Sequence, residues 1–344
     1  MALDRNSLIA LAKATAKASM NPSNSFSFEG KNLTFEALNE TFREEMNELA
    51  SNYREYRNNK NLIFELIEVG IDEVLPAKVM QNYGMFADVK TYAQGDKPIF
   101  NIRISEASRA RAKKNFVTRV GLAGRYEVFK LDGLNYEIPT SAWGGAAQIG
   151  FEEFLDGRIQ MSDVYDIILE GMDEAVYREI AKALAAAVES VPDINKTTQT
   201  AFVENQMDKL IQIADVYGKA TIYCTFEFAA TMLPAEAWAS DAMKQERWDI
   251  GYFTTYKGHN VIVLPQSFED TTNTTKVMDP STAYIIPTGA EKPVKVAFEG
   301  ETAVREVESN EDWSREIQTY RKFGAGVVLV NPGICVYINS SLAE

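Results

Sequence analysis

The sequence predicts an α+β fold, on the basis of two observations. Helical patterns and strand patterns follow one another in mixed order along the chain, and no repeat recurs at a fixed period. The composition suits a large folded protein, because 46% of the 344 residues are hydrophobic and 24% are charged. We therefore expect one large or two medium units with hydrophobic cores, and no extensive disorder.

Residues 1–60 are expected to form an N-terminal arm. Apolar residues recur at spacings of three and four from Phe35 to Tyr53, which is the pattern of an amphipathic helix. Segments rich in polar and turn-forming residues flank this helix at 21–25 and 53–61. An amphipathic helix between polar segments needs an apolar surface to pack against, so residues 1–60 are interpreted as an arm attached to the main folded part of the chain.

The body of the fold is expected to start after the arm. A dense apolar segment at 61–79 is predicted to end near Pro76, and strands are predicted at 85–93 and 97–104. Residues 104–147 alternate apolar and polar residues between several glycines, which predicts a long two-stranded excursion. Such a ribbon is only marginally stable alone, so it should be stabilised by packing elsewhere or on a partner chain.

The strongest predicted element is a helix that begins at Ser162 and stops before Pro192. Ser162 is the candidate N-cap, Asp163 lies in the first turn, and apolar residues form one face. At 1.5 Å per residue this helix would be roughly 40 Å long. From Glu152 to Glu189 there are ten acids and three bases, so the helix is an acidic rod with a local net charge of −7.

The rest of the chain alternates helices and strands. Apolar periodicity, glycines and prolines set the expected boundaries. Helices are predicted at 202–218 and 228–238, strands at 220–226, 261–265, 283–289 and 294–301, a closing strand pair within 318–338, and polar or acidic loops at 267–282 and 299–316.

No motif for enzymatic chemistry is found. Gly324 and Gly326 supply two glycines of a dinucleotide-binding fingerprint, but the third position is Leu329 and no suitable helix follows. The chain has no GxxxxGK[ST] phosphate loop and no HExxH, GxSxG or CxxC motif. We therefore predict that the protein is not an enzyme and uses no cofactor or metal.

Individual reactive residues also favour structural roles. Cys224 and Cys335 lie in apolar runs and are expected to be buried, reduced thiols. His259 is interpreted as a turn residue, because a lone histidine cannot supply a histidine-rich metal site. Adjacent acids on a helix do not face one another, so acidic pairs are interpreted as solvated or interface charges. These pairs are Glu152 with Glu153, Asp173 with Glu174, and Glu311 with Asp312.

Charge is distributed unevenly along the chain. The net charge of −14 argues against a surface that grips nucleic acid throughout, but residues 103–130 hold eight bases and two acids. Aromatic residues that could stack on bases are sparse there, so contact with an acidic neighbouring chain is favoured over nucleic-acid binding. The predicted inter-subunit contacts are Arg109, Arg111, Lys113, Lys114 and Arg119 on the basic segment, and Asp163, Asp166, Glu170, Asp173 and Glu174 on the acidic helix.

Three runs carry a family resemblance: residues 135–188, 248–265 and 318–338. In this order they resemble the return from an extended loop into a spine helix, the axial-domain passage and the closing strands of Hong Kong 97-type major capsid proteins of tailed phages. The resemblance covers residues 60–341, although the arm is longer and more helical than in minimal members.

The resemblance implies both a domain plan and a function. It implies an N-terminal arm at 1–60, an extended β loop at 96–150 and an axial domain at 201–295. The peripheral domain, with the spine helix, would combine 61–95, 151–200 and 296–344. The chain would assemble with itself into pentamers and hexamers of an icosahedral shell enclosing double-stranded DNA, with scaffold, portal and decoration proteins as further candidate partners. It would be assembled in the host cytoplasm and reside in the virion.

Two alternatives stay open at this point. Encapsulin nanocompartments use the same fold to enclose a cargo enzyme, and size and contents would separate them from a virus shell. An ordinary α+β enzyme would need a pocket that gathers several of the acids named above. A membrane partner is not expected, because no run approaches roughly 20 apolar residues and the N-terminus lacks a secretory signal.

Overall fold

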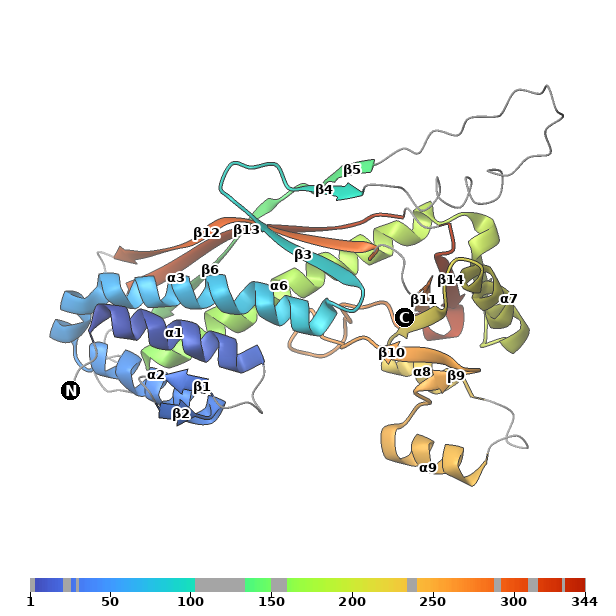
Figure 1. The fold of residues 1–344 in the computed structure, drawn as a ribbon, viewed down its shortest axis with the longest axis horizontal. Helices are drawn as coiled ribbons and strands as arrows, with labels where there is room; N and C mark the ends of the chain where they lie inside the picture. The colour runs from blue at the N-terminus through green and yellow to red at the C-terminus, as the bar shows by residue number, and fades with distance from the viewer. Residues whose placement is uncertain are drawn as a thin grey trace, which may run out of the picture. The chain divides into compact units, whose positions relative to one another are not determined.

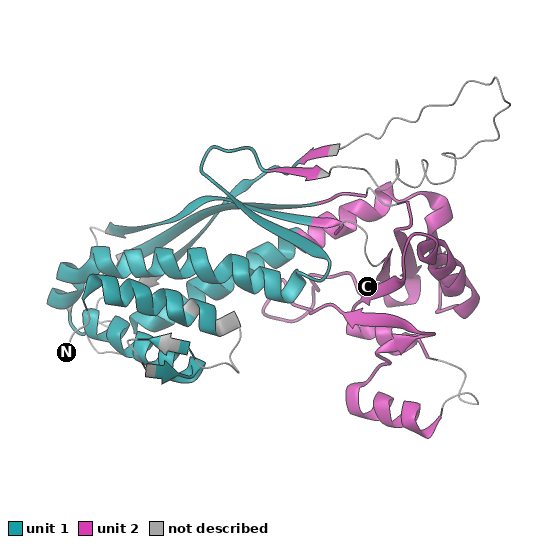
Figure 2. Ribbon diagram, viewed as in Figure 1, with its two compact units in different colours: residues 1–98, 137–179, 295–326 teal, residues 99–136, 180–294, 327–344 magenta. Residues whose placement is uncertain are grey.

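The computed structural model describes residues 4–20, 26–28, 31–102, 134–149, 160–233, 240–287, 292–308, 315–329 and 332–343. Helices and strands occur in mixed order, which confirms the predicted α+β class. The chain divides into two compact units, each built from separate stretches of sequence (Figure 2). Unit 1 comprises residues 1–98, 137–179 and 295–326, and unit 2 comprises 99–136, 180–294 and 327–344.

Three N-terminal helices of unit 1 pack together (Figure 1). They are α1 (Arg5–Met20), α2 (Phe35–Leu49) and α3 (Tyr53–Tyr83), and a small hairpin of β1 (Phe26–Phe28) and β2 (Lys31–Leu33) lies between α1 and α2 in the chain. The amphipathic helix expected after Phe35 is confirmed as α2, which buries Leu38, Phe42 and Met46. Thr34 caps it by accepting a hydrogen bond from the Ala37 amide.

Helix α3 does not end near Pro76, so that prediction was wrong. The helix continues to Tyr83 with Pro76 inside it. A proline inside a helix costs about 3 kcal/mol, because it removes one hydrogen bond and crowds the preceding turn. Packing on both sides of the proline offsets this cost, since Leu75 and Val79 are fully buried. The Ile71 carbonyl in the preceding turn also accepts a hydrogen bond from Arg321 Nη1 at 3.2 Å.

A four-stranded sheet in the order β3-β12-β13-β6 forms the other layer of unit 1 (Figure 1). The strands are β3 (Ala87–Tyr92), β12 (Val294–Glu308), β13 (Arg315–Val327) and β6 (Ser141–Ile149). β6 pairs antiparallel with β13, from Ser141 opposite Phe323 to Ile149 opposite Arg315. Along β13, Ile317, Thr319, Arg321 and Phe323 alternate onto the buried face.

The segment 299–316, expected to be an acidic loop, is largely strand. β12 extends to Glu308 and β13 begins at Arg315. Two of its acids have partners from distant parts of the chain, which the local sequence cannot reveal. Glu299 accepts a hydrogen bond from Thr140 at 2.5 Å, and Glu306 pairs with Lys60 at 3.2 Å.

The expected strands at 85–93 and 97–104 are confirmed as β3 and β4 (Ile99–Ile102). β4 pairs with β5 (Leu134–Glu137) in a two-stranded sheet. Most of the predicted excursion, including the basic residues from Arg109 to Arg119, lies outside the described residues.

The predicted long helix is confirmed as α6 (Met161–Ser190), about 45 Å long at 1.5 Å per residue. It ends before Pro192, as predicted. Its residues to Glu179 belong to unit 1, and those from Ile180 belong to unit 2.

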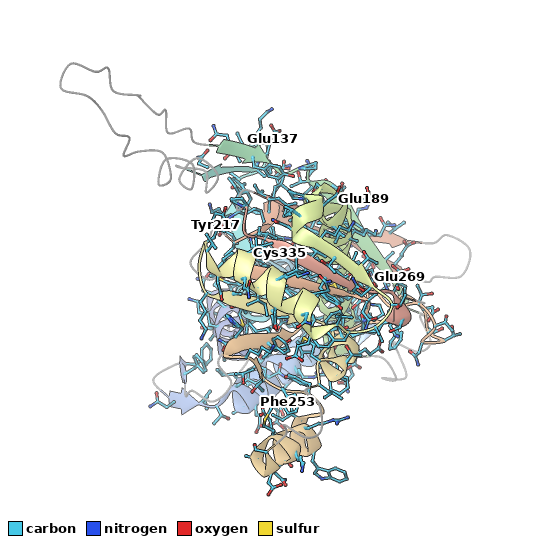
Figure 3. All side chains as sticks on the ribbon, turned by 90° about the vertical axis from the view of Figure 1, so that its right-hand side faces the viewer. Glu137, Glu189, Tyr217, Phe253, Glu269 and Cys335 are labelled. Carbon is cyan, nitrogen blue, oxygen red and sulfur yellow. The ribbon has the colours of Figure 1, made fainter. Side chains whose placement is uncertain are left out.

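Unit 2 is built on a six-stranded sheet in the order β7-β14-β11-β8-β10-β9. The strands are β7 (Lys196–Gln199), β14 (Cys335–Asn339), β11 (Thr282–Pro287), β8 (Ala220–Cys224), β10 (His259–Val263) and β9 (Thr255–Tyr256), and the helices are α7 (Glu204–Asp215), α8 (Phe226–Thr231) and α9 (Asp241–Ile250). Short 3-10 turns occupy Asp193–Asn195 and Ser340–Leu342. Figure 3 views this unit with Cys335 labelled on β14.

The core of unit 2 lies between this sheet and its helices. Leu210 and Ile211 of α7 pack with Ile222, Ile285 and other buried side chains of the sheet. Cys224 and Cys335 are buried free thiols, which confirms their expected role. Burial raises the pKa of both thiols to about 12.

His259 is a strand residue and not a turn residue. It begins β10, and its Nδ1 lies 3.2 Å from the Ala220 carbonyl of β8. His259 pairs antiparallel with Tyr256 of β9, directly after the turn at Lys257 and Gly258, so the TTYKGH sequence does hold a turn but His259 lies just beyond it. Trp248 opens the 248–265 run that precedes and includes this strand, and it belongs to helix α9.

Candidate assembly surfaces

Helix α2 of the arm is anchored to the N-terminus of α6 by one arginine. Arg43 Nη2 lies 2.9 Å from Asp163 Oδ1, and Arg43 Nη1 lies 2.6 Å from Asp166 Oδ2. Both acids lie in the first turns of α6, where negative charge also interacts favourably with the helix dipole. Burial raises the pKa of Asp166, while Arg43 acts in the opposite direction.

The N-cap of α6 is supplied from α2, so the prediction of Ser162 as the cap was wrong. The helix begins at Met161, which places Ser162 in its first turn. The Ser162 amide donates to Asn47 Oδ1 at 3.3 Å, and Asn47 Nδ2 donates to Gln160 Oε1 at 2.9 Å. Asp163 Oδ2 accepts from the Gln160 amide at 3.3 Å, as the third residue of a capping box does.

Tyr165 fills the space between three helices next to these polar contacts. Its ring meets Phe42 of α2 edge-on, with 5.6 Å between the ring centroids. A Cβ on Gly70 of α3 would lie 2.5 Å from Tyr165 Oη, so only glycine fits there. Burial raises the pKa of Tyr165 above its ordinary value. The arm helix therefore docks on α6 through apolar packing as well as charge.

The acids expected to contact neighbouring subunits mostly have partners within the chain. Besides Asp163 and Asp166, Asp173 pairs with Lys78 of α3 at 3.0 Å, and Glu174 pairs with Arg178 at 3.3 Å. Glu170 is exposed, and no cation in the described part of the chain pairs with it. Arg109, Arg111, Lys113, Lys114 and Arg119 lie outside the described residues. Their contact with an acidic neighbour stays a prediction.

Carboxylates of α3 cover part of the edge of β12. β3 has six residues and β12 has fifteen, so β3 cannot pair along the whole of β12. The Thr302 amide donates to Asp72 Oδ1 at 3.0 Å, and the Val304 amide donates to Glu68 Oε1 at 2.8 Å. Burial raises the pKa of Glu68, although its hydrogen bond from the Val304 amide acts in the opposite direction.

A buried arginine joins the same region. The side chain of Arg321 on β13 is 1% exposed, and its Nη1 lies 2.5 Å from Asp72 Oδ1 and 3.2 Å from Thr302 Oγ1. The guanidinium carbon lies 5.0 Å from the centroid of the Phe298 ring. Burial lowers the pKa of Arg321, and the Asp72 carboxylate opposes this shift.

Within the described ranges no group of three or more histidine, cysteine, aspartate and glutamate side chains could hold a metal ion. In that same part of the chain no helix has the length and apolar character needed to cross a lipid bilayer.

Comparison with known families decides which kind of protein this is. Residues 8–331 match the family described as "SPbeta prophage-derived putative capsid protein YonB". The chain belongs to this YonB capsid family. A YonB-family chain is a structural subunit of a phage-type capsid, so its place is the virion.

Solved structures support the same fold for this YonB-family chain. One is the capsid of a native GTA particle, with a TM-score of 0.51, 9% sequence identity, and coverage of 75% of this chain and 89% of that chain. The likeness shows the Hong Kong 97-type fold that the sequence resembles.

Two further solved structures are similar at lower scores. The head of Helicobacter pylori bacteriophage KHP40 has a TM-score of 0.48 at 14% identity, covering 76% of this chain and 91% of that chain. The holo-SrpI encapsulin of Synechococcus elongatus has a TM-score of 0.44 at 12% identity, covering 74% and 86%. No curated protein matches the chain.

Sequence reasoning missed the residues that hold the arm and the sheet. Arg43 and Asn47 lie on the polar face of α2 and touch α6 over more than 110 positions of sequence. No local signal distinguishes them from solvated residues. Arg321 could have been found, because strand alternation places it on the same face as the buried Phe323.

Proposed function

We propose that copies of this chain form pentamers and hexamers of a closed icosahedral shell that encloses double-stranded DNA. The observation that carries this proposal is the family match from residue 8 to residue 331, which spans both compact units. Closed shells follow when one subunit presents the same contact surfaces in every copy. The shell would be assembled in the host cytoplasm, with scaffold, portal and decoration proteins as further partners.

We assign roles to the parts of the chain on the family pattern. The arm at 1–60 and the loop at 96–150 would reach neighbouring subunits, and residues 201–295 would gather near the local symmetry axes. The peripheral domain would comprise 61–95, 151–200 and 296–344. The docking of α2 on α6 supports a folded arm, since Arg43 and Asn47 hold it in place.

The charge pattern supports enclosure of DNA without sequence-specific binding. A subunit with a net charge of −14 repels a phosphate backbone on average, so packaged DNA would not adhere to the shell. The basic segment around Arg109 to Arg119 would instead contact an acidic surface of a neighbouring copy. Glu170 and Glu189 are the exposed acids of α6 in the described residues, and Glu170 is the one of the predicted contacts that is free for such an approach.

Electron microscopy of the purified, overexpressed chain tests the proposed function directly. Closed shells or five- and six-fold capsomers are expected, with sedimentation to match and DNA in particles from infected or induced cells. Uniform small shells that enclose a protein cargo and no genome would favour the encapsulin alternative. A monomer or small dimer that concentration and a candidate scaffold leave unchanged would contradict the proposal.

Charge reversal tests the basic segment. Changing Arg109, Arg111, Lys113 and Lys114 to glutamate should abolish assembly while leaving the subunit folded, because attraction to an acidic neighbour becomes repulsion. The control reverses four exposed cations outside the arm and the loop, Lys182, Lys209, Lys219 and Lys244, with the same change in net charge. Shells of normal yield from the first variant would refute the assignment of this segment.

A further inference from the structure

Strand β6 forms one edge of the unit 1 sheet. All nine of its residues, Ser141–Ile149, are in register with β13 on one side. On its other side, no strand pairs with it among the described residues. An edge strand carries a row of backbone amides and carbonyls that can pair with another chain. At about 3.3 Å per residue, this edge is about 30 Å long.

β6 lacks the features that usually protect an edge. Its sequence SAWGGAAQI has no charged residue and no proline. The other described edges differ: β7 and β9 are short, with four and two residues, and β3 carries Asp88 and Lys90. The uncovered part of β12 is closed by Asp72 and Glu68 of α3. Within the described sheets, β6 is therefore the long unprotected edge.

The surface is hollowed on both faces of this edge. One hollow of about 520 Å³ lies over Gly144, Gly145 and Ala146 and is also lined by Arg305 and Tyr320. The second, of about 250 Å³, lies between the same three residues and α6, where Ile167 is 64% exposed. Side chains of an added strand alternate to its two faces, so both hollows are placed to receive them.

We propose that β6 pairs with an extended segment of a second copy of this chain, which adds a strand to the unit 1 sheet. This inference rests on the proposed shell, in which every copy meets other copies. Among the described residues that line the larger hollow, Arg305 alone is charged. Its positive charge favours an acidic partner, and a second copy of this chain is acidic overall, with 49 acids and 35 bases. One strand contact is too small to hold a free dimer, but repetition through a shell adds many such contacts.

Amide hydrogen exchange measures this pairing directly. Peptides covering Ser141–Ile149 should exchange at least about tenfold more slowly in assembled shells than in free subunits, because new inter-chain hydrogen bonds protect the outward amides. Peptides from β12 serve as the control and should change little. Shells in which the β6 peptides exchange as fast as in free subunits would overturn the inference and leave the proposed function standing. If the wild-type chain forms no shells, the proposed function fails and this inference fails with it.

A lysine on the edge provides the matching variant. A Cβ on Gly145 meets only Thr319 Oγ1, at 3.8 Å, so Gly145→Lys fits the free subunit. A lysine on an edge strand opposes strand addition. The variant should therefore lower shell yield at least about tenfold with an unchanged thermal midpoint. Val307→Lys, an exposed position on β12 that is not next to β6 in the sheet, is the control and should assemble normally. Normal shell yield from Gly145→Lys would contradict a role for pairing at this edge in assembly.

Discussion

At the residue scale, Arg321 shows how unit 1 holds a charge in its core. Its side chain is almost completely buried, and Asp72, Thr302 and the Ile71 carbonyl accept hydrogen bonds from it. Asp72 is 28% exposed and also accepts from the Thr302 amide. Asp72 therefore links helix α3 both to strand β12 and to the buried guanidinium of Arg321.

Replacement of Arg321 by methionine should lower the free energy of unfolding by about 2–4 kcal/mol, because it leaves the Asp72 carboxylate without its cation. Urea denaturation measures the loss. Arg305→Met on the outer face of the same sheet is the control, and should change stability by about 0.5 kcal/mol or less. Equal effects of the two substitutions would show that the buried network contributes little.

At the scale of elements, the contact between α2 and α6 determines whether the arm is docked. Arg43 bridges two acids of α6, and Asn47 binds its first turn. The charged side chains are between 38% and 45% exposed, so each ion pair contributes modestly. Docking depends on the sum of these contacts and the burial of Phe42 against Tyr165.

Arg43→Glu should release α2 more often, because three carboxylates then meet at the start of α6. Amide exchange across Phe35–Leu49 should become at least about fivefold faster, which corresponds to ~1 kcal/mol. Arg57→Glu, an exposed position on α3, is the matched control. If both variants exchange alike, Arg43 does not hold the arm.

At the scale of the whole molecule, two units with separate cores share one chain. Each unit is assembled from three stretches of sequence, and α6 contributes residues to both. Proteins built this way often depart from two-state unfolding.

Arg321→Met should therefore affect the two units differently. Native-state hydrogen exchange should become faster at core amides of unit 1, such as Ile63 and Ile67, and stay within about twofold at Ile222 and Ile285 of unit 2. The reason is that the buried network of Arg321 lies wholly in unit 1. A uniform acceleration across both units would show that they unfold as one.

Several elements could be predicted from the sequence because they depend on local patterns. The apolar period of α2, the long pattern of α6 and the strand predicted at 220–226 each identified the correct structure. Three predictions failed where distant residues intervened. Pro76 stays helical through packing, Asn47 replaces Ser162 at the α6 cap, and Lys60 pairs with an acid of the supposed loop.

The sequence by itself determined the fold class, the order of the elements and the absence of recognisable catalytic motifs, because these follow from periodicity, composition and spacing. It also carried the resemblance to capsid proteins, which the family match confirms. Only the tertiary structure decided which charges find partners. Asp163 and Asp166 reach Arg43 across 120 and 123 positions, and β6 becomes an edge through the pairing of strands far apart in sequence. Such contacts depend on how the chain folds back on itself, and no local pattern encodes that geometry.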